Sequence, residues 1–115
     1  MEITRAYVKS ILPHRDPEGH KGTFGKVYCL CGAVGYTGAP VLAASAAVRS
    51  GSGLVFLGVP KDIWPIVAVK CDSAMPSPLP SQQGKLALAA EDAVRARIDG
   101  CDAVLIGCGM GRSEE

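Results

Sequence analysis

The chain has 115 residues and a nearly balanced charge, with 12 lysines and arginines against 11 aspartates and glutamates and a formal net charge of +1. This length predicts a single domain, because a chain of this size buries roughly two-thirds of its unfolded surface. The near-neutral balance argues against an extended nucleic-acid interface, which needs a clear excess of basic residues.

The sequence predicts neither a membrane span nor an export signal. Arg49 interrupts the longest apolar candidate, and no apolar run reaches the ~18 residues that a membrane span needs. The amino-terminal stretch MEITRAYVKS carries Glu2 and has no continuous apolar core, unlike a signal peptide. We therefore expect a cytoplasmic protein without a membrane partner.

Five cysteines occur in the chain, without a Cys-x-x-Cys pair. Cys29 and Cys31 are two residues apart on a predicted strand and should therefore point to the same face of a sheet. His14 and His20 are the only histidines, so we predict no metal site. Buried reduced thiols, which behave as small hydrophobic groups, are the expected state in a cytoplasmic protein.

The first half of the chain predicts a β-α-β unit. Apolar runs bounded by glycines indicate buried strands, and a run rich in alanine between them indicates a helix that packs closely on the sheet. Pro40 falls in the first turn of this helix, where its missing N–H costs nothing. The predicted elements are a weak helix within residues 2–15, capped by Thr4, a strand at 26–32, a turn at 33–38, a helix at 39–49 and a strand at 54–59.

The second half predicts two helices and a third strand. Asp62 is expected to cap a short helix in which Trp64 covers the edge of the sheet. Ser81 is expected to cap a longer amphipathic helix. The predicted elements are a helix at 62–70, an extended loop at 71–80 that can hold a short edge strand, a helix at 81–98, a strand at 102–107 and a glycine-rich turn at 107–112.

The glycine-rich turns GAVGYTGA, at residues 32–39, and GCGMGR, at residues 107–112, each follow a predicted strand. In β-α-β units the unpaired N–H groups at the start of the helix face the crevice at the carboxyl ends of the strands, so we expect a ligand there. The spacing GxxGxxG differs from the dinucleotide fingerprint GxGxxG, and no acidic residue ends the second strand, so we reject a simple nicotinamide dehydrogenase. A tight turn without a ligand is the alternative interpretation.

Lys21-Gly22-Thr23 is a further candidate for phosphate binding. This tripeptide offers a cation, free backbone and a hydroxyl group. A solvated loop is the alternative interpretation, because the pattern is common.

The chain looks like the first part of a larger α/β domain. Three strands are predicted, and an all-parallel sheet usually needs more cover from helices on both faces. The last residues, Ser113, Glu114 and Glu115, have the composition of a helix start. Open sheet edges also predict self-association.

Three motifs, HKGTFGKV, GYTGAPVLAASAAVRSGSGLV and DAVLIGCGMGR, resemble in their order the opening of the NAD(P)H-hydrate dehydratases of the ribokinase-like superfamily. The resemblance implies an α/β fold, a three-layer α/β/α, Rossmann-like sandwich with a mostly parallel sheet. It implies a lyase of metabolite repair that dehydrates the S-epimer of hydrated NADH or NADPH while hydrolysing ADP or ATP. It also implies Mg²⁺ in the full-length enzyme and a homo-oligomer.

The resemblance also implies where the hydrated cofactor binds. Gly38 and Ala39 match the turn that lines this site in the family, and Gly109 and Gly111 match a second turn there. Together with Lys21, these are the predicted cofactor-binding residues. Cys108 stands where the family usually has proline, and Met110 where it usually has leucine; the second change nearly conserves volume.

The family's catalytic aspartate lies in a glycine-threonine-glycine-aspartate segment of its second half, and nothing here matches that segment. We therefore expect residues 1–115 to be the N-terminal portion of one dehydratase domain without its C-terminal half, to carry no catalytic residue and to be inactive alone. One alternative is a non-catalytic nucleotide-binding or assembly module. Another is part of a sugar or vitamin kinase, although no substrate-contacting Asn or Asp stands near the first strand.

Overall fold

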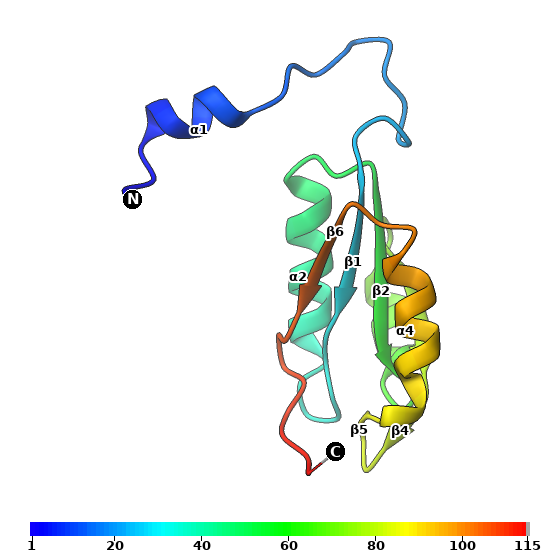
Figure 1. The fold of residues 1–115 in the computed structure, drawn as a ribbon. Helices are drawn as coiled ribbons and strands as arrows, with labels where there is room; N and C mark the ends of the chain where they lie inside the picture. Colours follow the sequence, from blue (N-terminus) through cyan, green and yellow to red (C-terminus); the bar gives the residue numbers. More distant parts are fainter. Residues whose placement is uncertain (115) are drawn as a thin grey trace.

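A four-stranded parallel sheet forms the centre of the chain in a computed structural model that describes residues 1–114 (Figure 1). The strand order is β3-β2-β1-β6. In the middle, β1 (Lys26–Leu30) pairs with β2 (Leu54–Pro60) and β6 (Ala103–Ile106), while β3 (Met75–Leu79) pairs with β2 at one edge. All three pairings are parallel, since crossover connections carry the chain from the end of one strand back to the start of the next. The parallel arrangement of the three predicted strands, β1, β2 and β6, is confirmed.

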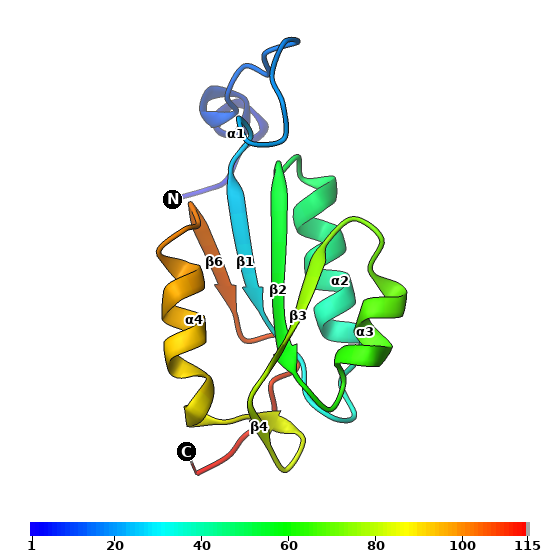
Figure 2. The ribbon, with the colours of Figure 1, turned by 90° about the vertical axis from the view of Figure 1, so that its right-hand side faces the viewer.

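Helices cover both faces of the sheet. Figure 2 shows α2 (Gly38–Arg49) and α3 (Trp64–Lys70) on one face and α4 (Glu91–Ile98) on the other. Alternate side chains of β1 point to opposite faces of the sheet, so Cys29 packs in one buried cluster and Tyr28 packs in the other. The three-layer α/β/α arrangement predicted from the sequence is confirmed.

The edge strand β3 forms within the proline-rich loop, where the sequence allowed a short edge strand, and it adds a fourth strand to the three that were predicted outright. Pro76 and Pro78 lie in this strand, opposite Leu57 and Val59 of β2. Proline cannot donate to a ladder and is therefore tolerated only at an edge, where one side of the strand needs no partner. Trp64 covers this edge as predicted, and its Nε1 donates to the carbonyl oxygen of Pro76 at 3.0 Å.

The predicted helix over 81–98 is wrong in its first half. Residues 81–86 instead form an antiparallel hairpin of β4 (Ser81–Gln82) and β5 (Lys85–Leu86), followed by a 3₁₀ turn, η1 (Leu88–Ala90), and only then α4. The two turn residues Gln83 and Gly84 have φ angles of 49° and 72°. Two positive φ angles in sequence are what a two-residue hairpin turn requires.

The caps expected for the second half differ accordingly. The Ser81 hydroxyl donates to the carboxylate of Asp62, so neither side chain caps a helix. The residue at the cap position of α3 is Ile63, whose side chain is fully buried. The hydrogen bond between Ser81 and Asp62 joins the segment after β2 to the start of the hairpin.

The amino-terminal helix α1 (Arg5–Ile11) projects from the sheet and contributes no buried residue (Figure 1). Thr4 caps it as predicted, since its hydroxyl accepts from the Tyr7 N–H at 3.2 Å. Arg15 anchors the segment that follows α1. Its guanidinium carbon lies 3.9 Å from the centroid of the Phe24 ring, and its Nη1 donates to the carbonyl oxygen of Gly51. Among the helices of residues 1–114, none has the length and apolarity that crossing a membrane needs.

Candidate functional site

The carboxyl edge of the sheet, where the four parallel strands end, gathers three connecting segments. These are the first turn (residues 31–37) after β1, the hairpin (residues 81–86) after β3 and the glycine turn (residues 107–112) after β6. Backbone hydrogen bonds join them. The Gly32 N–H donates to the carbonyl oxygen of Cys108 at 2.9 Å, and the Val34 N–H donates to the carbonyl oxygen of Gly84 at 2.8 Å. The sequence prediction that both glycine-rich turns lie at one edge is thus confirmed.

The glycine turn fits against the start of α2. A Cβ atom placed on Gly109 would stand 2.7 Å from the Cβ of Ala39 and 3.0 Å from the Cβ of Tyr36. Gly109 also has a φ of 69°, which favours glycine for a second reason. Two of the predicted binding residues, Ala39 and Gly109, are therefore direct neighbours.

Gly38 has open space beside it. Nothing lies within 4 Å of a Cβ placed there, and Gly38 is the first residue of α2. Thr37 occupies the cap position, but its side chain makes no capping hydrogen bond. The first-turn N–H groups of α2 can therefore serve an incoming anion or polar group.

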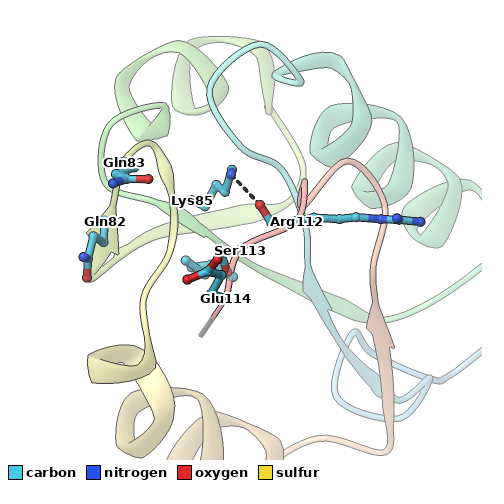
Figure 3. A pocket seen from close by; sticks show the side chains of 7 residues that line it. Gln82, Gln83, Lys85, Arg112, Ser113 and Glu114 are labelled. Carbon is cyan, nitrogen blue, oxygen red and sulfur yellow. Dashed lines mark hydrogen bonds between the residues drawn. The ribbon is translucent and has the colours of Figure 1, made fainter.

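A cavity of about 660 Å³ opens between the hairpin and the end of the described chain (Figure 3). Gly111 borders it, because a Cβ placed there would lie 3.2 Å from Cε of Lys85. The Lys85 ammonium donates to the carbonyl oxygen of Arg112, and Figure 3 shows the Arg112 side chain pointing away from Lys85. The lining residues are Gln82, Gln83, Lys85, Leu86, Arg112, Ser113 and Glu114.

Lys21 is not part of this arrangement, contrary to the expectation that it would join the other four residues. Its carbonyl oxygen lies beside Gly53, 1.7 Å from where a Cβ of that residue would stand. Gly53 immediately precedes β2, so Lys21 lies at the amino ends of the strands. The length of β1, on the order of 16 Å, separates it from the glycine turns.

Two buried cysteines, Cys29 and Cys31, lie at the carboxyl end of β1. Cys29 and Cys31 are fully buried and pack in the same cluster, which confirms that they share a face of the sheet. Burial, with a smaller contribution from the neighbouring Cys108, raises the pKa of the Cys31 thiol to about 12. Burial also raises the pKa of Cys29. Both groups are therefore neutral near pH 7.

Sequence reasoning missed the hairpin and with it Lys85. The available signal was Gly84, which with Gln83 separates the pairs Ser81-Gln82 and Lys85-Leu86 by the two residues of a hairpin turn. Within residues 1–114, no three His, Cys, Asp or Glu side chains come together to hold a metal ion. The chemistry that this arrangement supports is close approach of a ligand to glycine backbone, with a cation nearby.

Comparisons with known proteins identify the family. The pattern of the NAD(P)H-hydrate dehydratases matches residues 27–115. The bifunctional NAD(P)H-hydrate repair enzyme of Moorella thermoacetica is 40% identical over 111 residues, which is 96% of this chain and 21% of that protein. Other curated relatives show similar coverage, so the chain spans about a fifth of their length.

Solved structures agree in fold. A ribokinase-like superfamily protein of Enterococcus faecalis superposes with a TM-score of 0.76 at 20% identity, over 97% of this chain and 36% of that one. The ADP/ATP-dependent NAD(P)H-hydrate dehydratase of Bacillus subtilis, co-crystallised with ATP and Mg²⁺, superposes with a TM-score of 0.64 at 25% identity. This superposition covers 93% of this chain and 45% of the Bacillus subtilis chain. With a ribokinase-like fold and a family pattern over most of its length, this chain belongs to the NAD(P)H-hydrate dehydratase family.

Proposed function

We propose that the chain forms the part of a hydrate dehydratase that binds hydrated NADH or NADPH, with the S-epimer as substrate. One observation carries the proposal, namely the seating of Gly109 against Ala39 beside the open start of α2. Gly38, Ala39, Gly109 and Gly111 form the surface for the ligand. A nicotinamide dinucleotide needs such a surface because backbone without side chains admits the closest approach.

Lys85 supplies the cation for a phosphate group of this ligand. Its ammonium donates to one backbone carbonyl, so among residues 1–114 two of its three N–H groups remain to bind a ligand. Arg112 adds positive charge to the same segment. Lys21 has no role in this arrangement, because it stands at the other end of the strands.

ADP or ATP is the co-substrate of the complete domain, as the name of the Bacillus subtilis relative indicates for that protein. Transfer of a phosphoryl group needs positioned groups that stabilise developing charge. The residues described here offer Lys85 and glycine backbone for that purpose, and they do not bring together ligands for Mg²⁺. We propose that the remaining groups belong to a further part of the domain.

Titration calorimetry with hydrated NADPH tests the binding step. We expect the chain to bind it and Gly109→Ala to weaken binding, because that substitution separates the two turns. Gly35→Ala is the matched control, since Gly35 also has a positive φ but faces open space. Absence of binding, or equal binding by the two variants, would contradict the proposed site.

A second experiment tests whether the 115 residues bind the substrate but need the rest of the domain for turnover. Incubation of the chain with hydrated NADPH and either ADP or ATP should give no recovery of the absorbance of NADPH. Addition of the rest of the domain from a relative, as a separate chain, should restore it. Robust turnover by the 115 residues alone would show that they contain the reactive groups.

We further propose that the protein works in the cytoplasm as a homo-oligomer. All five cysteines are unpaired in the structure, the state that a reducing compartment maintains. Strands β3 and β6 leave both edges of the sheet without a partner among the described residues. Such edges favour pairing with a second copy.

A further inference from the structure

Three of the five cysteines lie together where β1 and β6 end. Cys29 and Cys31 belong to β1 and its continuation, and Cys108 is the second residue of the glycine turn. The ladder pairs Leu30 with Ile106, so the chain continuing from each strand runs side by side. The Gly32 N–H donates to the carbonyl oxygen of Cys108 at 2.9 Å and fixes this neighbourhood.

The side chains of Cys31 and Cys108 lie on the same face of the sheet. Cys31 packs in the buried cluster that contains Ala44 of α2, and Cys108 borders a groove lined by the same helix. Their accessibility differs sharply, because Cys31 is 0% exposed whereas Cys108 is exposed. Cys108 opens into an apolar groove that Ala39, Leu42 and Leu105 also line. A small oxidant can therefore reach Cys108 but not Cys31.

The backbone around Cys108 can adjust. Gly107 and Gly109 flank it with φ angles of 132° and 69°, and nothing lies within 4 Å of a Cβ on Gly107. Glycine on both sides lets the intervening residue move by small rotations at little steric cost. Small rotations at the two glycines can thus move the Cys108 side chain relative to Cys31, while the paired strands before them stay in register.

We propose that Cys31 and Cys108 are a reversible disulfide modification site, closed by hydrogen peroxide and opened by thiols. The thiolate of Cys108 attacks one peroxide oxygen, the O–O bond breaks, and the leaving hydroxide takes up a proton to become water. Cys108 is then a sulfenic acid. The sulfur of Cys31 attacks the sulfenic sulfur, the S–O bond breaks, and the departing hydroxide takes the Cys31 proton as a second water.

The atoms and electrons of this sequence balance. The two thiols lose two protons and two electrons, and one peroxide takes up both and is reduced to two waters. Burial protects Cys31 from peroxide until the sulfenic acid forms beside it. Its proton must leave as it attacks, and the departing hydroxide is the base that takes it. Attack by an external thiolate frees one cysteine and leaves a mixed disulfide on the other, and a second external thiolate then frees that one as the two external thiols join in a disulfide.

The bond would restrain the glycine turn. Gly109 follows Cys108 directly and seats against Ala39, so a disulfide beneath it ties the turn to β1. We expect amide hydrogen exchange over residues 107–112 to slow in the oxidised protein. This effect concerns the chain itself and needs no ligand, so it is separable from the proposed substrate.

Peptide mapping without reduction tests the site. The reduced chain, treated with an equimolar amount of hydrogen peroxide, should lose two of its five free thiols and yield a Cys31–Cys108 cross-linked peptide. Dithiothreitol should restore both thiols. Cys108→Ser should abolish the loss, whereas Cys101→Ser should keep it, because Cys101 lies before β6 at the opposite end of that strand.

The contrary outcomes are equally definite. Oxidation of Cys108 to the sulfinic acid with Cys31 left free, or a disulfide only between two chains, would overturn the proposal. Cys31→Ala serves as the second variant: it should trap Cys108 as a sulfenic acid that a dimedone probe labels. Equal dimedone labelling of the unsubstituted chain and Cys31→Ala would show that Cys31 does not resolve the intermediate.

Discussion

Gly109 lies so close to Ala39 that a Cβ atom on the glycine would stand 2.7 Å from the Cβ of the alanine. The two residues are 70 positions apart in the chain, counting from 39 to 109. Their contact joins the glycine turn after β6 to the first turn of α2 after β1. Small side chains at both positions are what allows the two connections to share one surface at the carboxyl edge of the sheet.

Gly109→Ala should therefore destabilise the chain and weaken ligand binding together. A left-handed φ costs a non-glycine residue on the order of 1–3 kcal/mol, and the close contact with Ala39 adds to it. Urea unfolding should show this loss. Gly35→Ala has a similar φ of 88° but nothing within 4 Å, so its loss should be the smaller of the two. A loss for Gly35→Ala equal to that for Gly109→Ala would mean that the contact with Ala39 carries no energy.

Gly53→Ala should cost more free energy of unfolding than either. The new Cβ would stand 1.7 Å from the backbone oxygen of Lys21, and a backbone atom cannot move aside as a flexible side chain can. We expect a loss of about 3 kcal/mol or more, the upper range for overpacking. Gly38→Ala is the control because its Cβ would meet open space, and unfolding should change by about 0.5 kcal/mol at most. Comparable urea midpoints for the two variants would refute this reading of the packing.

The central strands could be predicted from the sequence because their signal is local. Lys26–Leu30 and Ala103–Ile106 are short apolar runs bounded by glycine or polar residues, and such runs form strands whatever their partners. The burial expected for the second run is wrong, because Ala103–Ile106 lies at an open edge of the sheet and is largely exposed. The strand at Met75–Leu79 could not be found with the same certainty. Its prolines argue against a strand, and they are tolerated only because tertiary structure places it at an edge.

The site itself was only half predictable. That two glycine turns meet at one edge follows from parallel topology, but the fit of Gly109 against Ala39 depends on tertiary packing that no local pattern records. Lys85 was hidden because the apolar positions after it continue into α4 and resemble one long helix. Gln83 at a positive φ is an uncommon choice for a hairpin turn, so the usual Asn-Gly signal was missing.

Lys85→Met should weaken binding of hydrated NADPH and reduce the salt dependence of the remaining affinity. Methionine keeps the apolar stem and removes the charge, so stability should change by less than about 1 kcal/mol. Lys70→Met is the matched control, because Lys70 ends α3 away from the cavity. Calorimetry at low and high salt measures both. Unchanged affinity in Lys85→Met would place the phosphate elsewhere.

Alkaline pH should destabilise the fold through Cys31. The pKa of this thiol is about 12 in the folded chain against an ordinary value of 9.0, because burial disfavours the thiolate. Between those two values the unfolded chain has released its proton and the folded chain has not. The unfolded state is therefore favoured as pH rises, and the stabilising contribution, complete below pH 9.0, is lost progressively towards pH 12.

Burial raises the pKa values of Cys29 and Tyr28 as well, so their contributions have the same sign. Each group can steepen the decline by up to about 1.4 kcal/mol per pH unit. Urea unfolding under reducing conditions, repeated at increasing pH, measures the slope. Cys31→Ala should be less stable at neutral pH because it loses buried volume, yet its stability should fall less steeply with pH. Parallel slopes for the variant and the unsubstituted chain would mean that Cys31 ionises as readily in the folded chain as in the unfolded one.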